Sequence, residues 1–284
     1  MPARRLFFLS LCKDCQDTLP AFLAMLEQIG TDPDFEVHAC FGENGSRDRT
    51  VALLDAAAAT NPRIQRLDTG FMSGVGERLA RMAAGREFLK SGLPPPLPGD
   101  VVIVADPDLV FAPELTPALL RKALIELEEP GVTGVCSHSL PRYYDVLALV
   151  EEANSTNPAL SRYLPSLKPR TQAEKLLGLP RRLWLHSRVV ATQKRLGNGA
   201  GLKVISAFNG LCIYRRSLFD AASYLGTATD CEHVHLHRAL HRRDGSRIRI
   251  SNVVGVEAPA EHIASVGQVL VARLSQALKT RKQR

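Results

Sequence analysis

The chain has 284 residues, of which 45% are hydrophobic and 23% charged, so it can bury a sizeable core and does not have the composition of a disordered or fibrous protein. Its net charge of +7 favours phosphate-bearing ligands or an anionic membrane surface, but its basic segments lack interleaved aromatic residues, which argues against a nucleic-acid partner. No apolar run approaches the roughly 18 residues that a membrane span needs. Six scattered cysteines are typical of reduced thiols in a cytoplasmic protein.

Strands and helices are predicted to alternate through the first half of the chain. The N-terminus has basic residues before an apolar run, as a signal peptide does, but the run is short and no cleavage site follows, which favours a buried strand at Leu6–Leu11. Thr18 is placed to cap a helix with apolar residues at i, i+3, i+4 and i+7. The next predicted elements are a strand at Phe35–Phe41, a helix at Val51–Ala58, a strand at Ile64–Leu67 and a helix around Leu79–Ala83.

A proline-rich connection at residues 94–99 leads into the most hydrophobic segment, Val101–Ala105. Repeated βα units with continuous apolar strands predict an α/β fold with a mainly parallel central sheet, flanked by helices on both faces. The pattern weakens at about 151–202, a polar and basic segment that we interpret as a helical insertion or lid. The other predicted elements are a helix at Leu115–Leu127, strands at Val132–Cys136, Val204–Phe208, Leu211–Tyr214 and Arg247–Ile250, a helix at Cys231–His241 and a C-terminal helix at about 261–280.

Two acidic residues separated by one position, Asp106 and Asp108, directly follow the apolar strand at 101–105. In open α/β sheets, ligands bind beyond the carboxyl ends of the strands. A carboxylate pair there can hold Mn²⁺ or Mg²⁺, which neutralises a bound diphosphate. The alternative interpretation is an Asp-rich turn without a ligand.

The segment Glu43–Thr50 follows the second predicted strand and has the sequence ENGSRDRT. Acidic and amide side chains at that position can bind the hydroxyls and the base of a nucleoside, while Asp48 or Thr50 begins the next helix. A plain capping loop would have a similar sequence, because Asn, Gly, Ser and Asp all favour turns and helix N-termini.

These segments together resemble the GT-A glycosyltransferases, in particular the branch that contains the fungal capsule-associated mannosyltransferases and their bacterial relatives. The resemblance covers about residues 5–257 and implies one domain over 1–284, with a nucleotide-binding half at about 1–130 and an acceptor half at about 131–260. Its motifs are ENGSRDRT, ADPD at 105–108, RYYD at 142–145, FNGLCIYRRSLF at 208–219 and DCEH at 230–233.

The resemblance also implies roles for individual residues. Glu232 is our first choice as the general base at an acceptor hydroxyl and Asp230 the second; the alternative is that both only complement the dipole of the following helix. A clear E-D pair, common in bacterial relatives, is missing, which leaves the base uncertain. The other implied roles are donor binding by Glu43, Asn44, Ser46, Asp48, Arg78, Arg81 and Asp106, metal binding by Asp106, Asp108 and His262, and acceptor binding by Asn209, Gly210 and Asp145.

The expected function is therefore transfer of a sugar from a nucleotide-sugar donor to a glycan or lipid-linked acceptor, in cell-surface polysaccharide synthesis. GDP-mannose is suggested by the resemblance alone, and UDP-sugars remain open. The C-terminal helix has an apolar stripe and a basic tail, so it could contact an anionic membrane, but packing of the stripe on the domain is favoured.

Three other hypotheses remain. Cys12 and Cys15 have the C-x-x-C spacing of a thioredoxin-like redox protein. A protein of the expected fold could also bind a nucleotide sugar without turning it over. Finally, His233, His237 and His241 share one helical face, with His235 nearby, which suggests zinc, but the Glu of an H-E-x-x-H motif is missing and surface or supporting roles are favoured.

Overall fold

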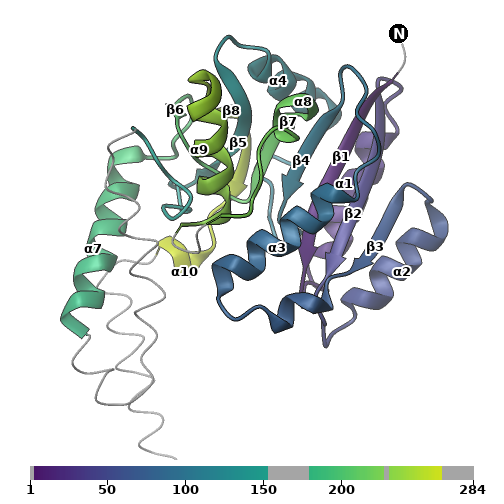
Figure 1. Cartoon of the computed structure of the whole chain (residues 1–284), viewed down its shortest axis with the longest axis horizontal. Helices are drawn as coiled ribbons and strands as arrows, with labels where there is room; N and C mark the ends of the chain where they lie inside the picture. The colour runs from purple at the N-terminus through teal and green to yellow at the C-terminus, as the bar shows by residue number, and fades with distance from the viewer. Residues whose placement is uncertain (1–2, 153–178, 227–229, 264–284) are drawn as a thin grey trace, which may run out of the picture.

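The computed structural model describes residues 3–152, 179–226 and 230–263, in which eight strands form one sheet (Figure 1). Their spatial order is β3-β2-β1-β4-β7-β5-β8-β6. The strands are β1 (Arg4–Cys12), β2 (Phe35–Glu43), β3 (Ile64–Asp68), β4 (Val101–Ala105), β5 (Val132–Leu140), β6 (Lys203–Val204), β7 (Leu211–Arg215) and β8 (Arg247–Glu257).

The sheet is mainly parallel, as the sequence predicts. Strands β3, β2, β1 and β4 are mutually parallel neighbours, and β5 and β8 form a second parallel pair. Strand β7 lies between these groups and is antiparallel to both β4 and β5, while β6 pairs antiparallel with β8. The carboxyl ends of β1, β2, β3 and β4 therefore meet at one edge of the sheet.

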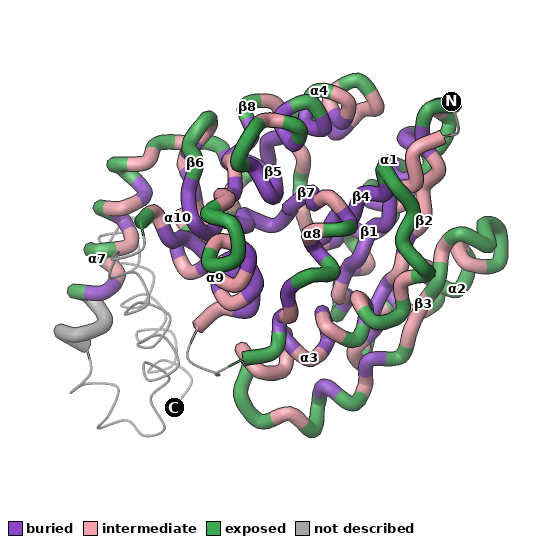
Figure 2. The backbone as a smooth tube through the Cα atoms, turned by 45° about the horizontal axis from the view of Figure 1, so that its top comes forward, coloured by how far each residue is buried: buried purple, intermediate pink, exposed green. Residues whose placement is uncertain are grey.

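Helices cover both faces of the sheet (Figures 1 and 2). Successive side chains of a strand point to opposite faces. Leu6 and Phe8 of β1 therefore pack with α1 (Leu19–Gly30) and α4 (Pro117–Leu127), whereas Phe7 and Leu9 pack with α3 (Arg78–Ser91), α8 (Arg216–Phe219) and α9 (Glu232–Asp244). The central strand β4 is buried along its whole length and is apolar throughout, as expected of a strand covered on both faces. The helical segments are α1 (Leu19–Gly30), α2 (Thr50–Thr60), the 3-10 turn η1 (Gly70–Gly74), α3 (Arg78–Ser91), α4 (Pro117–Leu127), α7 (Leu179–Leu196), α8 (Arg216–Phe219), α9 (Glu232–Asp244) and α10 (Ala260–Ile263).

Three local predictions differ from the structure. The strand expected at Val204–Phe208 is extended only at β6, because the chain then turns through Asn209 and Gly210, whose φ angles are 57° and 85°. The last strand is longer than expected and continues to Glu257, with irregular pairing to β5. Thr18 precedes α1, but its hydroxyl donates to the Cys15 carbonyl instead of accepting from the helix.

The segment expected as a lid contains α7, and the start of the expected C-terminal helix is α10; residues 153–178 and the basic tail lie outside the described residues. The division into a nucleotide half and an acceptor half stays a prediction. Across the described ranges, no helix is both long enough and apolar enough to cross a membrane.

Candidate functional site

The carboxyl edge of the parallel strands brings the two main sequence motifs together. In the register of the sheet, Cys12 at the end of β1 lies opposite Glu43 at the end of β2, and Glu43 lies opposite Asp68 of β3. Strand β4, on the other side of β1, ends at Ala105, directly before Asp106. The predicted nucleoside and metal segments therefore follow strands of the same edge, separated by β1.

The segment of residues 44–50, which we call the nucleoside loop, is hydrogen-bonded to the loop that follows β1. The Ser46 hydroxyl accepts the N–H of Asp14 at 3.0 Å, and the Asp48 carboxylate accepts the N–H groups of Gln16 at 3.0 Å and Thr50 at 2.9 Å. Two of the predicted donor-binding side chains, Ser46 and Asp48, thus hold backbone in place. The segment is therefore an ordered turn before α2, and nucleoside binding by it stays a prediction.

Two other predicted donor-binding residues, Glu43 and Asn44, have side-chain atoms that the hydrogen bonds of this loop do not use. Glu43 is buried and one carboxylate oxygen, Oε1, accepts the N–H of Ser46 at 2.5 Å. No hydrogen bond within the described residues occupies its second oxygen, Oε2, or the side-chain amide of the half-buried Asn44. These are the groups that can meet ribose hydroxyls or a base.

The two arginines predicted to approach the diphosphate, Arg78 and Arg81, differ in their contacts. Arg78 is the first residue of α3 and its side chain is exposed. Arg81 donates from Nε to the Val75 carbonyl at 3.1 Å and from Nη2 to the Gly76 carbonyl at 3.2 Å, so it fixes the turn before α3. Arg78 alone is therefore free to contact a phosphate.

A third arginine of α3, Arg86, forms the centre of the site. Its side chain is 4% exposed, and it donates from Nη2 to Asp106 Oδ1 at 2.9 Å and from Nε to Glu232 Oε1 at 3.1 Å. Burial alone would lower the pKa of Arg86, but the charges of Asp106 and Glu232 outweigh it and raise that pKa. One buried cation thus joins the predicted metal-binding carboxylate to the predicted general base.

The sequence interpretation missed Arg86, although a signal existed. Leu79, Met82, Ala83 and Leu89 mark the apolar stripe of α3, and Arg86 lies on the same stripe at helical spacing. A charged residue on an apolar stripe needs a buried partner. The sequence alone could not say which carboxylates those partners are.

An aromatic wall supports the guanidinium of Arg86. The ring of Phe208 lies 5.0 Å from the Arg86 guanidinium carbon and stacks on His233, with ring centroids 3.5 Å apart. His233 is buried and neither ring nitrogen has a hydrogen-bond partner in the described structure. Burial first, and the Arg86 charge second, keep the pKa of His233 well below its usual value, so the ring is neutral.

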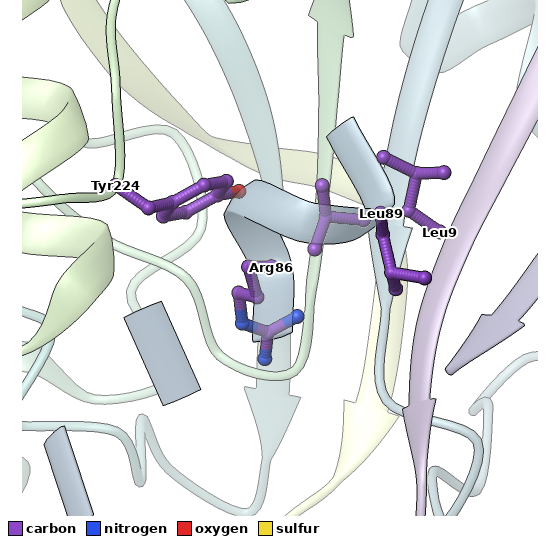
Figure 3. Close-up of a pocket in the computed structure, with 5 residues that line it drawn as sticks. Leu9, Arg86, Leu89 and Tyr224 are labelled. Atoms are coloured by element: carbon purple, nitrogen blue, oxygen red, sulfur yellow. The ribbon is translucent and has the colours of Figure 1, made fainter. Parts of the chain in front are cut away.

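Behind Arg86 lies a small hollow, also lined by Leu9, Leu89, Val104 and Tyr224 (Figure 3). It leaves no space for a water molecule, so it is part of the packing around Arg86 and not a substrate pocket. Arg86 Nη1 and the Tyr224 hydroxyl are both buried without a hydrogen bond in the described residues.

Asp106 and Asp108 differ in their surroundings. The side chain of Asp106 is 31% exposed, and burial raises its pKa against the opposing charge of Arg86. Asp108 is exposed and adds a like charge that also raises the pKa of Asp106. Two carboxylates at this spacing suit a hard divalent cation, which prefers oxygen ligands.

His262, the third predicted metal ligand, lies on α10 and stacks on Tyr144 with ring centroids 5.6 Å apart. Over residues 3–152, 179–226 and 230–263, no three His, Cys, Asp or Glu side chains are close enough together to hold a metal ion. Asp106, Asp108 and His262 therefore do not form a preassembled three-ligand site. The histidines of α9 likewise form no such group within the described residues.

Those histidines have supporting roles. His237 Nδ1 lies 2.9 Å from the Ser206 hydroxyl and Nε2 lies 2.6 Å from the Tyr214 hydroxyl, so it ties α9 to the sheet. Burial lowers the pKa of His237 to about 3, which keeps the ring neutral. His241 closes the end of α9 through a 2.8 Å contact from Nδ1 to the Ser246 carbonyl.

The predicted acceptor residues form the opposite side of the edge. Asn209 is fully buried: its side chain donates to the Ser137 carbonyl at 3.1 Å and accepts from the Ser139 hydroxyl at 3.2 Å. The prediction that Asn209 lines an acceptor pocket needs correction, because its amide is used within the protein. It supports the site indirectly, since its N–H donates to Asp145 Oδ2 at 3.2 Å.

Gly210 and Asp145 lie closer to the carboxylates. The Gly210 carbonyl accepts the N–H of Asp106 at 2.8 Å, and an added Cβ at Gly210 would come within 2.8 Å of the Tyr144 hydroxyl. Burial raises the pKa of Asp145 to about 6, and the charges of Asp106 and Glu232 contribute to the rise. Asp145 is thus within electrostatic reach of Asp106, a predicted metal ligand, and of Glu232, the predicted base.

Glu232 and Asp230 lie at the start of α9. Glu232 is its first residue and is 6% exposed, and besides Arg86 it accepts a hydrogen bond from the Cys231 thiol at 3.5 Å. Asp230 is more accessible, and its Oδ2 lies 3.6 Å from Arg238 Nη1. The structure thus brings Glu232, and not Asp230, into contact with the Arg86 cluster.

The comparisons with known proteins identify the fold. No protein-family model matches the chain, and no curated protein sequence matches it. A solved structure of a mannosyltransferase from Pyrobaculum calidifontis, in complex with GDP-Man and Mn²⁺, matches 94% of this chain with a TM-score of 0.50 at 15% identity. The match covers 61% of the mannosyltransferase, so this chain spans less than two thirds of its length.

Two other solved structures have lower TM-scores. Glucosyl-3-phosphoglycerate synthase from Mycobacterium tuberculosis matches 95% of this chain and 78% of its own, with a TM-score of 0.49 and 17% identity. Mannosyl-3-phosphoglycerate synthase from Rubrobacter xylanophilus matches 99% and 76%, with a TM-score of 0.46 and 15% identity. The fold is α/β and of the GT-A type, which corrects the thioredoxin-like alternative.

Proposed function

We propose that the protein is a metal-dependent glycosyltransferase that moves a sugar from GDP-mannose or a UDP-sugar to a hydroxyl of a glycan or lipid-linked acceptor. The observation that carries this proposal is the Arg86 cluster. It joins Asp106, at the end of the central strand, to Glu232, at the start of α9, within a GT-A fold. A carboxylate for a metal and a carboxylate for a proton at one sheet edge are what sugar transfer from a diphosphate requires.

The donor would lie across the ends of β2, β1 and β4. Glu43 and Asn44 offer oxygen and nitrogen atoms to the nucleoside, and the exposed guanidinium of Arg78 can contact the diphosphate. Asp106 and Asp108 would hold Mn²⁺ or Mg²⁺, with His262 as a further candidate. When bound, the ion supplies positive charge that stabilises the departing nucleoside diphosphate.

The described residues have no preassembled set of three ligands, so oxygens of the nucleotide, together with water, would complete the coordination of the ion. This makes metal binding and nucleotide binding interdependent. Arg86 uses one oxygen of Asp106, Oδ1, so the other oxygen could contact the ion.

In the transfer step, Glu232 would accept the proton of the acceptor hydroxyl as its oxygen attacks the anomeric carbon of the donor sugar. The bond from that carbon to the diphosphate breaks, and the nucleoside diphosphate leaves with the bonding electrons. Asp230 is the second candidate base. Asp145 and Gly210 would border the acceptor, with Asn209 holding Asp145 from behind.

The first prediction concerns the nucleotide and the metal. At a hundredfold excess over its Kd, GDP or UDP with Mn²⁺ should stabilise the protein by roughly 2.7 kcal/mol. Mn²⁺ alone should have little effect, because the nucleotide must complete the coordination. Thermal shift with Mn²⁺, with nucleotide and with both, each repeated in EDTA, is the measurement.

The matched variant is Asp108→Asn, whose side chain is exposed and whose loss should leave the unliganded protein as stable as the wild type. It should lose the part of the shift that depends on Mn²⁺. Equal stabilisation in EDTA would contradict the metal site, and no shift with any nucleotide would contradict the donor site. Nucleotide binding without any transfer would indicate a nucleotide-sugar-binding protein instead.

A lipid-linked acceptor, as in cell-surface polysaccharide synthesis, belongs to the proposal because of the motifs shared with the capsule-associated mannosyltransferases. If the basic tail contacts a membrane, anionic vesicles should co-sediment the full chain, high salt should release it, and a chain ending at Ser275 should not bind. Failure of the full chain to sediment at low salt would contradict membrane contact and favour an acceptor met in solution.

A further inference from the structure

Two rings from distant parts of the chain are held together near the carboxyl edge. His262 of α10 stacks on Tyr144, with ring centroids 5.6 Å apart and planes inclined by 18°. The His262 carbonyl accepts a hydrogen bond from Gln193 Nε2 at 2.7 Å, and the same nitrogen lies 3.5 Å from the Tyr144 carbonyl. One side-chain amide of α7 thus joins the backbones of both stacked residues.

Gln193 is fully buried, and burial of its amide has a cost. Its Oε1 has no hydrogen-bond partner in the described structure. An apolar side chain at this position would avoid that unpaired oxygen. The amide is therefore best explained by its donor side, which ties α7 to Tyr144 and His262.

The hydroxyl of Tyr144 lies at the carboxyl edge. An added Cβ at Gly210 would come within 2.8 Å of this hydroxyl, and the Gly210 carbonyl accepts the N–H of Asp106 at 2.8 Å. The Tyr144 side chain is half-buried, and no hydrogen bond within the described residues uses its hydroxyl. A phenol in that position can donate a hydrogen bond to an oxygen of a ligand.

The order of the strands places this hydroxyl on the path of a nucleotide sugar. The proposed nucleoside groups lie at the end of β2, Asp106 follows β4, and Gly210 directly precedes β7, which pairs with β4 on the side away from β1. With the diphosphate at Asp106, the sugar that it carries would extend away from the nucleoside, toward Gly210 and Tyr144.

We propose that the Tyr144 hydroxyl binds a hydroxyl of the donor sugar, and that His262 and Gln193 are positioning residues that hold the Tyr144 ring. The sugar as ligand rests on the proposed function, whereas the positioning rests on the contacts alone. His262 then acts as a support and not as a metal ligand. Its imidazole stacks on Tyr144 and belongs to no group of three possible metal ligands within the described residues.

The ligand is tested by titration calorimetry in Mn²⁺, comparing GDP-mannose with GDP and UDP-glucose with UDP. Tyr144→Phe keeps the ring and removes only the hydroxyl. We expect it to weaken binding of the nucleotide sugar by about two- to tenfold, the range for one hydrogen bond, and to leave binding of the diphosphate unchanged. An unchanged affinity for the nucleotide sugar, or equal weakening of both ligands, would overturn the sugar assignment.

The matched control is Tyr143→Phe. Tyr143 is fully buried, and its hydroxyl has no hydrogen-bond partner in the described structure. Removing this hydroxyl should therefore leave the affinities for the nucleotide sugar and for the diphosphate as they are in the wild type. Loss of sugar binding in both variants would show a general effect of altered packing and overturn the role of the Tyr144 hydroxyl.

Two variants of His262 separate support from metal binding. His262→Ala removes the ring and should weaken the nucleotide sugar as Tyr144→Phe does. His262→Phe keeps a flat ring against Tyr144 but has no nitrogen for a metal, so it should recover most of the lost affinity and keep the Mn²⁺-dependent part of the thermal shift with GDP or UDP. If both variants lose that part of the shift, His262 is a metal ligand and the positioning role is wrong.

Gln193→Met tests the link to α7. Methionine has nearly the length of glutamine but no N–H to donate, so the two carbonyls are no longer joined. We expect weaker binding of the nucleotide sugar with unchanged binding of the diphosphate, measured on the same protein so that any change in stability affects both ligands alike. A variant with wild-type affinity for the nucleotide sugar would exclude Gln193 as a positioning residue.

The stack can also be measured without any ligand. In a double-mutant cycle of Tyr144→Ala and His262→Ala, followed by urea unfolding, we expect a coupling of about two- to tenfold in the unfolding equilibrium constant, as for other ring pairs. Additive effects would overturn the positioning. A wild type that binds no nucleotide would contradict the proposed function, whereas additive effects or an unchanged Tyr144→Phe in a wild type that does bind nucleotide would contradict the present proposal alone.

Discussion

Replacing Glu232 by Gln is expected to lower the rate of sugar transfer by about 10²–10⁴-fold, the usual contribution of a general base, while donor binding is kept. Gln has the size of Glu but cannot take up a proton. Its amide oxygen can still accept the hydrogen bond from Arg86 Nε, which the carboxylate accepts at 3.1 Å in the structure. Transfer measured beside the thermal shift with GDP or UDP separates catalysis from binding.

The matched control is Asp230→Asn. Asp230 lies at the same end of α9, but its Oδ2 lies 3.6 Å from Arg238 Nη1, whereas Glu232 is the carboxylate that contacts Arg86, so we expect this variant to retain most of its activity. An active Glu232→Gln with an inactive Asp230→Asn would move the role of base to Asp230. Normal rates in both variants would exclude a catalytic base at the start of α9.

Features that depend on neighbouring residues in the sequence could be predicted. Asp106, for example, could be placed at the carboxyl edge of the sheet because it directly follows an apolar strand. A strand buried on both faces must end before charged residues can reach solvent. The mainly parallel sheet was predictable for the same reason.

Features that depend on distant contacts could not be predicted. Arg86 is separated from Asp106 by 20 positions and from Glu232 by 146, so its partners were hidden although its place on an apolar stripe marked it. Asn209 looked like a free binding residue, but a polar side chain before Gly can equally be used in a buried turn, and here it is. Sequence patterns show that a buried polar group needs a hydrogen-bond partner or an ion-pair partner, but they do not identify the residue that provides it.

Ser46 and Asp48 illustrate a second limit. Their residue types fit a nucleoside-binding loop and a helix-capping loop equally well, because both need short polar side chains beside free backbone N–H groups. In the structure their side chains bind backbone of the neighbouring loop and of α2. They therefore hold the loops in place, whereas no hydrogen bond within the described residues uses Glu43 Oε2 or the Asn44 side-chain amide, and residue type and spacing alone could not have separated these two roles.

Replacing Arg86 by Met is expected to destabilise the protein more than any other change considered. Arg86 is 4% exposed and is the cation that pairs with both Asp106 and Glu232. Removing one partner of a buried ion pair costs about 3–5 kcal/mol, because the remaining charge is left uncompensated. For a chain of this size, that corresponds to a fall in Tm of roughly 6–20 °C.

Two controls separate charge from packing and position. Arg86→Lys keeps the positive charge but replaces the planar fork by a single ammonium, which cannot reproduce both contacts, so it should recover only part of the lost stability. Arg78→Met, on the exposed start of α3, should change stability by less than about 0.5 kcal/mol. If Arg78 contacts the diphosphate, that variant should still weaken nucleotide binding.

The pH dependence of the Arg86→Met effect has a defined sign. Burial already raises the pKa of Asp106 above its usual 3.8, and the charge of Arg86 is the strongest influence that lowers it. Without Arg86 that pKa rises further, so above about pH 4 the folded variant keeps a proton that the unfolded chain has released, and its stability falls as pH rises. Below about pH 4 the carboxyl is protonated in both states and this loss disappears. The Tm difference between variant and wild type should therefore be larger at pH 7.5 than at pH 4.5, and an equal difference at both pH values would show that Arg86 acts through packing and not through charge.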